Sequence, residues 1–145
     1  MEILGIDIGA SGMKGAIVDI EKGELLTERF RIETPRPATP GAMAAVIKKI
    51  LAHFKWNGPV GCGFPTAIKN GVALTESNLH KKWVGVNAEE LFENETGLPF
   101  IVANDADVAG IAEMNFGAGK GKKGFVLIIT VGTGLGCGAF YNGQL

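Results

Sequence analysis

Two similar glycine-rich segments lie far apart in this 145-residue chain. The first reads GIDIGASGMKGAIVD at residues 5–19, and the second reads IITVGTGLGCGAFYN at residues 128–142. Each reads as an apolar strand, a polar glycine turn and a second apolar strand. Such turns direct backbone N–H groups at anions, since glycine allows close approach and positive φ. The pair favours two phosphate-binding turns that face one cleft over the alternative of two ordinary hairpins.

Composition and charge narrow the class of protein. A hydrophobic content of 46% is enough for a core, and a net charge of −1 argues against a nucleic-acid partner. No apolar run reaches the roughly 18 residues of a membrane helix, and the first strand begins near Met1, so we expect a cytoplasmic protein without a signal peptide or membrane partner. Cys62 and Cys137 lack metal-site spacing, and we interpret both as reduced, packing thiols.

The order of expected elements predicts an α/β chain with a mixed sheet and flanking helices. Strands are expected at 2–8, 13–20, about 24–33, 60–64, 71–75 and 100–103, and around the second turn. Thr39 followed by Pro40 predicts the start of a first helix, and Asn87 with Glu90 predicts a capping box for a second. A third helix is expected at about 106–116.

Five motifs in order carry a resemblance to a known family. They are DIGASGMK at 7–14, GFP at 63–65, NLHKKW at 78–83, NDAD at 104–107 and GTGLG at 132–136. Together they resemble the amino-terminal part of the polyphosphate glucokinases, a branch of the repressor–ORF–kinase (ROK) sugar kinases. The resemblance spans the whole chain and implies the actin-like, ribonuclease-H-like ATPase fold. It also implies Mg²⁺-dependent phosphoryl transfer from polyphosphate or ATP to the 6-hydroxyl of glucose, and a homodimer at full length.

The chain departs from the family in two ways. Ala10 stands where the family usually has a second glycine, a change that a small residue tolerates. Family members continue well beyond the second turn, whereas this chain ends at Leu145. We therefore expect residues 1–104 to form a first actin-like domain and residues 105–145 to begin a truncated second one, and we expect the 145-residue chain alone to be inactive.

Asp105 is the candidate base. It lies between the end of an expected strand and the start of a helix, where open α/β sheets bind ligands. Sugar phosphorylation needs a base within hydrogen-bond reach of the attacking hydroxyl. The helix N-terminus is expected to keep Asp105 ionised, which holds the base ready but weakens it. From spacing alone, the alternative that Asp105 only caps the helix is favoured, and it is the resemblance that implies the catalytic role. The resemblance implies that Asn78, Asn104 and Pro65 belong to the sugar site.

The phosphate and metal candidates cluster at the two turns. The expected phosphate-binding set is Gly9, Ala10, Ser11, Gly12, Lys14, Gly132, Thr133 and Gly134. Asp7 is expected to hold Mg²⁺ through water, with the closing of an Asx turn as the alternative. His80 and His53 are interpreted as structural or surface residues. Three lysines of the linker, Lys120, Lys122 and Lys123, are either a solvated run or a holder for the tail of a long polyanion at the mouth of the donor site.

Other functions remain open at this point. The alternatives are another hexose or N-acetylhexosamine kinase of the same group, a non-catalytic sugar-responsive regulator and an actin-like ATPase that transfers phosphate only to water. The expected absence of a DNA-binding segment before the first strand disfavours the regulator, and the Asn104-Asp105 pair disfavours the ATPase. The GKGKKG run at 119–124 fits GxGxxG but precedes a strand, whereas a dinucleotide-binding loop follows one.

Overall fold

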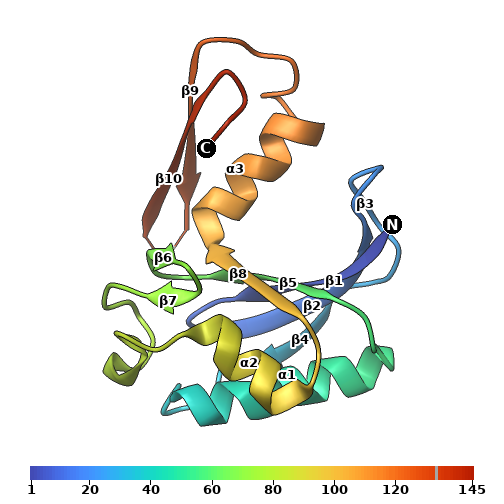
Figure 1. Ribbon diagram of the computed structural model, residues 1–145, viewed down its shortest axis with the longest axis vertical. Helices are drawn as coiled ribbons and strands as arrows, with labels where there is room; N and C mark the ends of the chain where they lie inside the picture. Colours follow the sequence, from blue (N-terminus) through green and yellow to red (C-terminus); the bar gives the residue numbers. More distant parts are fainter. Residues whose placement is uncertain (133) are drawn as a thin grey trace.

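A six-stranded mixed sheet is the centre of the fold (Figure 1). The computed structural model describes residues 1–132 and 134–145. The sheet has the order β3-β2-β1-β5-β8, and β4 also pairs with β2. β1 is antiparallel to β2 and parallel to β5, which is parallel to β8. The predicted α/β class with a mixed sheet is thus confirmed. The strands of this sheet are β1 (Glu2–Ile8), β2 (Gly12–Asp19), β3 (Glu24–Leu25), β4 (Phe30–Glu33), β5 (Val60–Phe64) and β8 (Phe100–Asn104).

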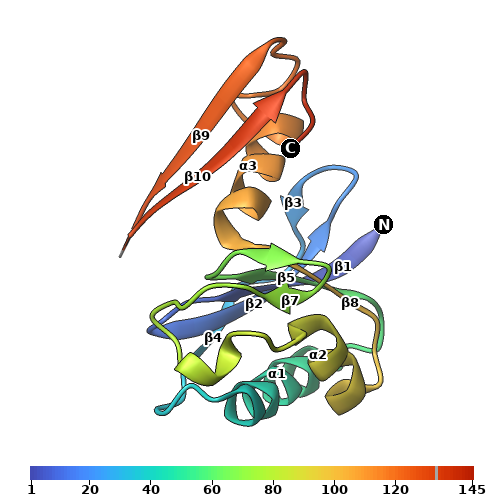
Figure 2. The same cartoon turned by 60° about the vertical axis from the view of Figure 1, so that its left-hand side comes forward.

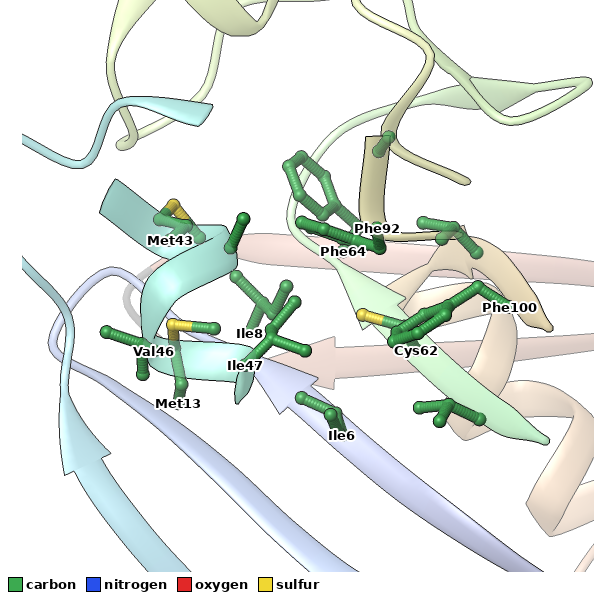
Figure 3. Packing of buried hydrophobic residues seen from close by; sticks show 14 of the residues in the cluster. Ile6, Ile8, Met13, Met43, Val46, Ile47, Cys62, Phe64, Phe92 and Phe100 are labelled. Atoms are coloured by element: carbon green, nitrogen blue, oxygen red, sulfur yellow. The ribbon is translucent and has the colours of Figure 1, made fainter. Parts of the chain in front are cut away.

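The hydrophobic core lies on one face of this sheet. Helices α1 (Pro40–Phe54) and α2 (Ala88–Thr96) cover that face (Figures 1 and 2). Alternate residues of β1 point into the core, because side chains of a strand alternate between its faces. Leu4, Ile6 and Ile8 are buried there, and Figure 3 shows Ile6 and Ile8 packed beside Ile47 of α1. The opposite residues of β1, Gly5 and Asp7, therefore face away from the core.

Both predicted helix starts are confirmed. α1 begins at Pro40 with Thr39 at the N-cap position, although the Thr39 side chain makes no capping hydrogen bond. α2 begins after Asn87, whose Oδ1 accepts a hydrogen bond from the Glu90 N–H at 3.1 Å. Glycine at position 97 ends α2 in the left-handed conformation, with a φ of 74°.

Two expected strands differ from the structure. The strand expected at 24–33 is divided into β3 and β4, whose registers on β2 differ by two residues. Between them, the hydroxyl of Thr27 accepts the Ile17 N–H at 3.0 Å. The strand expected at 71–75 is one arm of a small hairpin, β6 (Ile68–Lys69) and β7 (Val72–Ala73). Its turn is Asn70-Gly71, with φ values of 51° and 77°.

The last part of the chain lies on the other face of the sheet (Figure 2). It comprises α3 (Asp105–Phe116) and the hairpin of β9 (Phe125–Val131) and β10 (Leu135–Tyr141). The buried ring of Phe140 holds the hairpin against α3, since it lies so close to Gly110 that a Cβ there would be 2.6 Å from its Cε2 atom. Among the described residues, no helix is long and apolar enough to cross a membrane.

Candidate active site

One cavity of about 750 Å³ brings the two glycine turns together. Gly9 and Ala10 of the first turn line it, and so do Gly132 and Gly134 of the second. Of the residues predicted for the site, it also includes Pro65, Asn78, Asn104 and Asp105. The lining does not include Asp7, Ser11, Gly12 or Lys14, and Thr133 lies outside the described residues. The two turns therefore face a common space that also contains the candidate base.

The N-terminus of α3 positions Asp105. The cap of this helix is Asn104, whose Oδ1 accepts hydrogen bonds from the N–H groups of Ala106 and Asp107 at 3.0 and 3.2 Å. Asp105 is the first helical residue, and its Oδ1 accepts the Ala106 N–H at 2.8 Å. The capping function is thus already filled by the preceding residue, which leaves the second carboxylate oxygen of Asp105 for another partner.

The surroundings of Asp105 raise its pKa. Burial is the largest cause, because a carboxylate loses hydration in the partly buried site. The negative charges of Asp7 and Asp107 act in the same direction, while the Ala106 N–H opposes them. The expectation that the helix N-terminus weakens this base is therefore wrong in net direction, because burial outweighs the backbone hydrogen bond.

Three carbonyl oxygens of the first turn, those of Gly9, Ser11 and Gly12, accept hydrogen bonds inside the protein. The Gly12 carbonyl accepts the Gly9 N–H at 3.0 Å. The Gly9 carbonyl accepts the hydroxyl of Thr34 at 2.6 Å, and the Ser11 carbonyl accepts Nη2 of Arg31 at 2.8 Å. The N–H groups of Ala10 and Ser11 have no partner among the described residues. A turn arranged in this way has three of its acceptors occupied and two of its donors available, which suits an anion site.

Asp7 and Lys14 stand beside this turn. Lys14 Nζ lies 3.4 Å from Asp7 Oδ2, and both side chains are about half exposed, at 47% and 58%. A Cβ on Gly63 would lie 3.6 Å from the Asp105 Cα, so this face of β5 is turned towards α3. Asp7 is the register partner of Gly63 and lies on the same face. Asp7 and Lys14 line a smaller cavity of about 290 Å³ together with Arg29.

A buried threonine joins the hairpin β6–β7 to Asn104. Thr66 is 5% exposed, and its hydroxyl lies 2.7 Å from both the carbonyl and the hydroxyl oxygen of Thr75. The Thr66 carbonyl accepts Nδ2 of Asn104 at 3.0 Å. Asn104 therefore keeps one amide hydrogen for a ligand. Sequence reasoning missed Thr66 and Thr75, which no motif indicates.

The structure also shows the surroundings of the two histidines and the two cysteines. His80 caps the short 3₁₀ helix η1 (Lys81–Trp83) by accepting the Lys82 N–H at 3.1 Å, and exposed His53 stacks on Phe30 with ring centroids 3.7 Å apart. Burial raises the pKa of the Cys62 thiol. Cys137 is exposed and lines the large cavity, so its interpretation as a packing thiol is wrong.

The linker lysines do not lie at the mouth of the cavity. Lys120, Lys122 and Lys123 precede β9, whereas the second turn follows it. Seven residues of β9, at ~3.3 Å each, separate the two ends by more than 20 Å. Figure 1 shows the linker at the end of the hairpin that is remote from the main sheet. The predicted placement is therefore wrong.

Comparisons with known proteins agree with the arrangement of the site. Residues 3–145 match the model of the ROK family. The chain is 44% identical over 142 residues to a polyphosphate glucokinase of Mycobacterium tuberculosis, an alignment that covers 97% of this chain and 54% of the relative. The chain thus spans about half the length of the curated relatives it matches.

Solved structures support the same relationship. The inorganic polyphosphate/ATP-glucomannokinase from Arthrobacter sp. strain KM superposes with a TM-score of 0.94 at 43% identity, over 99% of this chain and 59% of that one. A ROK family glucokinase from Streptomyces griseus, in complex with glucose and AMPPNP, superposes with a TM-score of 0.86 at 32% identity, over 99% of this chain and 46% of that one. These matches confirm the predicted actin-like ATPase fold.

Proposed function

The chain belongs to the ROK family, and we propose that the protein transfers a phosphoryl group from polyphosphate or ATP to the 6-hydroxyl of glucose. The observation that carries this proposal is the common cavity of the two glycine turns and Asp105. A phosphoryl transferase needs a donor site and a base beside one acceptor site, and the cavity offers both. The names of the relatives supply the substrates, namely glucose and polyphosphate or ATP.

Asp105 acts as the general base in this proposal. Its carboxylate accepts the proton of the 6-hydroxyl while the sugar oxygen attacks the terminal phosphorus of the donor. The new bond joins the sugar oxygen to phosphorus, and the bond from phosphorus to the bridging oxygen breaks. ADP or a shortened polyphosphate leaves with the electron pair. A raised pKa brings the carboxyl closer to the working pH, which favours proton transfer.

The donor phosphates bind between the two turns. The N–H groups of Ala10 and Ser11, the side chain of Lys14 and the turn of Gly132, Thr133 and Gly134 hold them. The sugar lies on the side of Pro65, Asn78 and Asn104. The spare amide hydrogen of Asn104 is the donor it offers to a sugar hydroxyl.

The acidic residues of the site fit a magnesium ion. Within the described ranges there is no cluster of three or more His, Cys, Asp or Glu side chains that forms a complete metal cage. Mg²⁺ does not need one, since it is usually bound by one or two carboxylates together with substrate phosphates and water. Asp7 is the residue that would hold it, through water, and the ion would neutralise charge on the donor phosphates.

The larger organisation is part of the same proposal. Residues 1–104 form a first domain, and residues 105–145 begin a second. Their position on opposite sides of the cavity supports this division. The full-length protein is a homodimer in the cytoplasm, as the resemblance to its family implies. Light scattering of the purified protein tests the dimer.

A kinase assay tests the activity. Full-length protein is incubated with glucose and Mg²⁺, and with tripolyphosphate, long-chain polyphosphate or ATP in separate reactions. Formation of glucose 6-phosphate with at least one donor is expected. Donor hydrolysis without sugar phosphate would indicate an ATPase, and phosphorylation of another hexose or an N-acetylhexosamine in preference to glucose would contradict the substrate.

A further inference from the structure

The first glycine turn is held by a neighbouring strand that no motif assigns to the site. β4 pairs with β2, and its Arg31 is the register partner of Lys14. Cross-strand partners present their side chains on the same face of a sheet. Arg31 and Lys14 therefore form a pair of cations on the face that carries Asp7, directly beside the turn.

The guanidinium of Arg31 lies over the turn. Its Nη2 donates to the Ser11 carbonyl at 2.8 Å. Gly12 leaves the room for this arrangement, since a Cβ at that position would be 2.5 Å from Nε and 2.7 Å from Nη2. An arginine has five N–H donors in a fixed fork, and the bond to Ser11 uses one of them. The exposed side chain thus has further donors beside the free N–H groups of the turn.

We propose that Arg31 is a phosphate-binding residue of the donor site, acting with Lys14 and the N–H groups of the first turn. The ligand is the phosphate group that polyphosphate and ATP share. The bond to Ser11 fixes both the guanidinium and the turn, so the site is ordered before the donor arrives. Thr34 completes the arrangement, because its hydroxyl holds the Gly9 carbonyl away from the anion. This inference rests on the proposed function.

Substitutions at Arg31 in the full-length protein test the inference. Arg31→Met removes both the charge and the planar set of guanidinium donors, whereas Arg31→Lys keeps only the charge. Arg36→Met is the matched control, at an exposed arginine of the loop that follows β4. A lost hydrogen bond to a charged group raises KM roughly ten- to hundredfold. We expect this rise for tripolyphosphate and for ATP with Arg31→Met, a smaller rise with Arg31→Lys, and none with Arg36→Met. KM for glucose stays unchanged.

Salt dependence separates a phosphate contact from a merely structural role. Loss of one charge–phosphate contact makes donor binding less sensitive to salt, by analogy with the release of counterions from nucleic acids. Thr34→Val removes the hydroxyl that bonds the Gly9 carbonyl and does not change the charge. It therefore raises KM for the donor but leaves the salt slope, the dependence of log KM on the logarithm of salt concentration, as in wild type. Arg31→Met lowers the slope. An unchanged slope in Arg31→Met would contradict a phosphate contact.

The outcomes distinguish this inference from the proposed function. If wild type phosphorylates glucose and Arg31→Met matches Arg36→Met in KM for both donors, the role of Arg31 is refuted while the kinase activity stands. If wild type binds neither donor in calorimetric titrations with tripolyphosphate and AMPPNP, the proposed function itself is refuted. A rise in KM for one donor alone supports the site and identifies which donor reaches Arg31.

Discussion

Replacement of Asp105 by asparagine removes the proposed base and leaves its surroundings in place. Asn104 caps α3, so the cap is untouched, and the new amide keeps an oxygen for the Ala106 N–H that now lies 2.8 Å from the carboxylate. Loss of a general base costs roughly 10²–10⁴ in rate. At ~1.36 kcal/mol per tenfold, this is about 2.7–5.4 kcal/mol of activation free energy. We expect kcat to fall by that factor while glucose still binds.

The assay measures glucose 6-phosphate formation at saturating donor over a series of pH values. A protonated carboxyl cannot accept the proton of the sugar, so kcat/KM of the wild type falls as the pH falls through the raised pKa of Asp105. Asp105→Asn lacks this acid limb. A fall in kcat of less than about tenfold, below the range for a general base, or an unchanged acid limb would refute the assignment.

Stability gives an independent control for the same variant. The raised pKa means that the folded state favours protonated Asp105, so the ionised form at neutral pH destabilises the fold. This penalty is present above the folded-state pKa and disappears as the pH falls through it. Asparagine lacks the charge at every pH. The melting temperature of Asp105→Asn at neutral pH is therefore expected to equal or exceed that of the wild type, and a clear decrease would point to a structural role.

Three further changes test other parts of the structure. Phe140→Ala should cost about 3–5 kcal/mol of unfolding free energy in urea titrations, because it empties the contact that holds the hairpin on α3; a cost under about 1 kcal/mol would contradict that contact. Thr66→Val should raise KM for glucose and Thr66→Ser should restore it, since the hydroxyl bonded to Thr75 closes the loop beside Asn104; equal KM values in all three proteins would refute this. Replacing Lys120, Lys122 and Lys123 together by alanine should leave KM for long-chain polyphosphate unchanged, because the lysines lie at the far end of β9; a large rise would show that they contact the donor.

Local sequence signals predicted much of the fold. Thr39-Pro40 and Asn87 marked two helix starts, because the residues that favour the start of a helix lie within its first turn and can be recognised locally in the sequence. The hairpin β6–β7 was missed although Asn70-Gly71 is a strong hairpin signal, since the arms on either side of it have only two residues each. The break between β3 and β4 is a shift of register on β2, and no periodicity of the sequence reveals it.

In the candidate site, too, some residues could be recognised in the sequence and others depend on contacts that form only in the fold. The glycine turns were visible from their residue types and spacing, whereas Asp105 was assigned through the family resemblance, and the structure brings all of them to one cavity. Arg31 and Thr34 reach the first turn only through the register of β4 on β2, which the sequence does not display. The direction of the Asp105 pKa depends on burial that arises only when α3 meets the sheet.

A crystal structure of the full-length protein with glucose, AMPPNP and Mg²⁺ tests the central claim most directly. We expect the terminal phosphate to lie between the turn of Gly9–Gly12 and the turn of Gly132–Gly134. We also expect the 6-hydroxyl oxygen of glucose to lie about 2.6–3.2 Å from a carboxylate oxygen of Asp105. A donor bound outside the cavity, or a glucose whose 6-hydroxyl points away from Asp105, would contradict it.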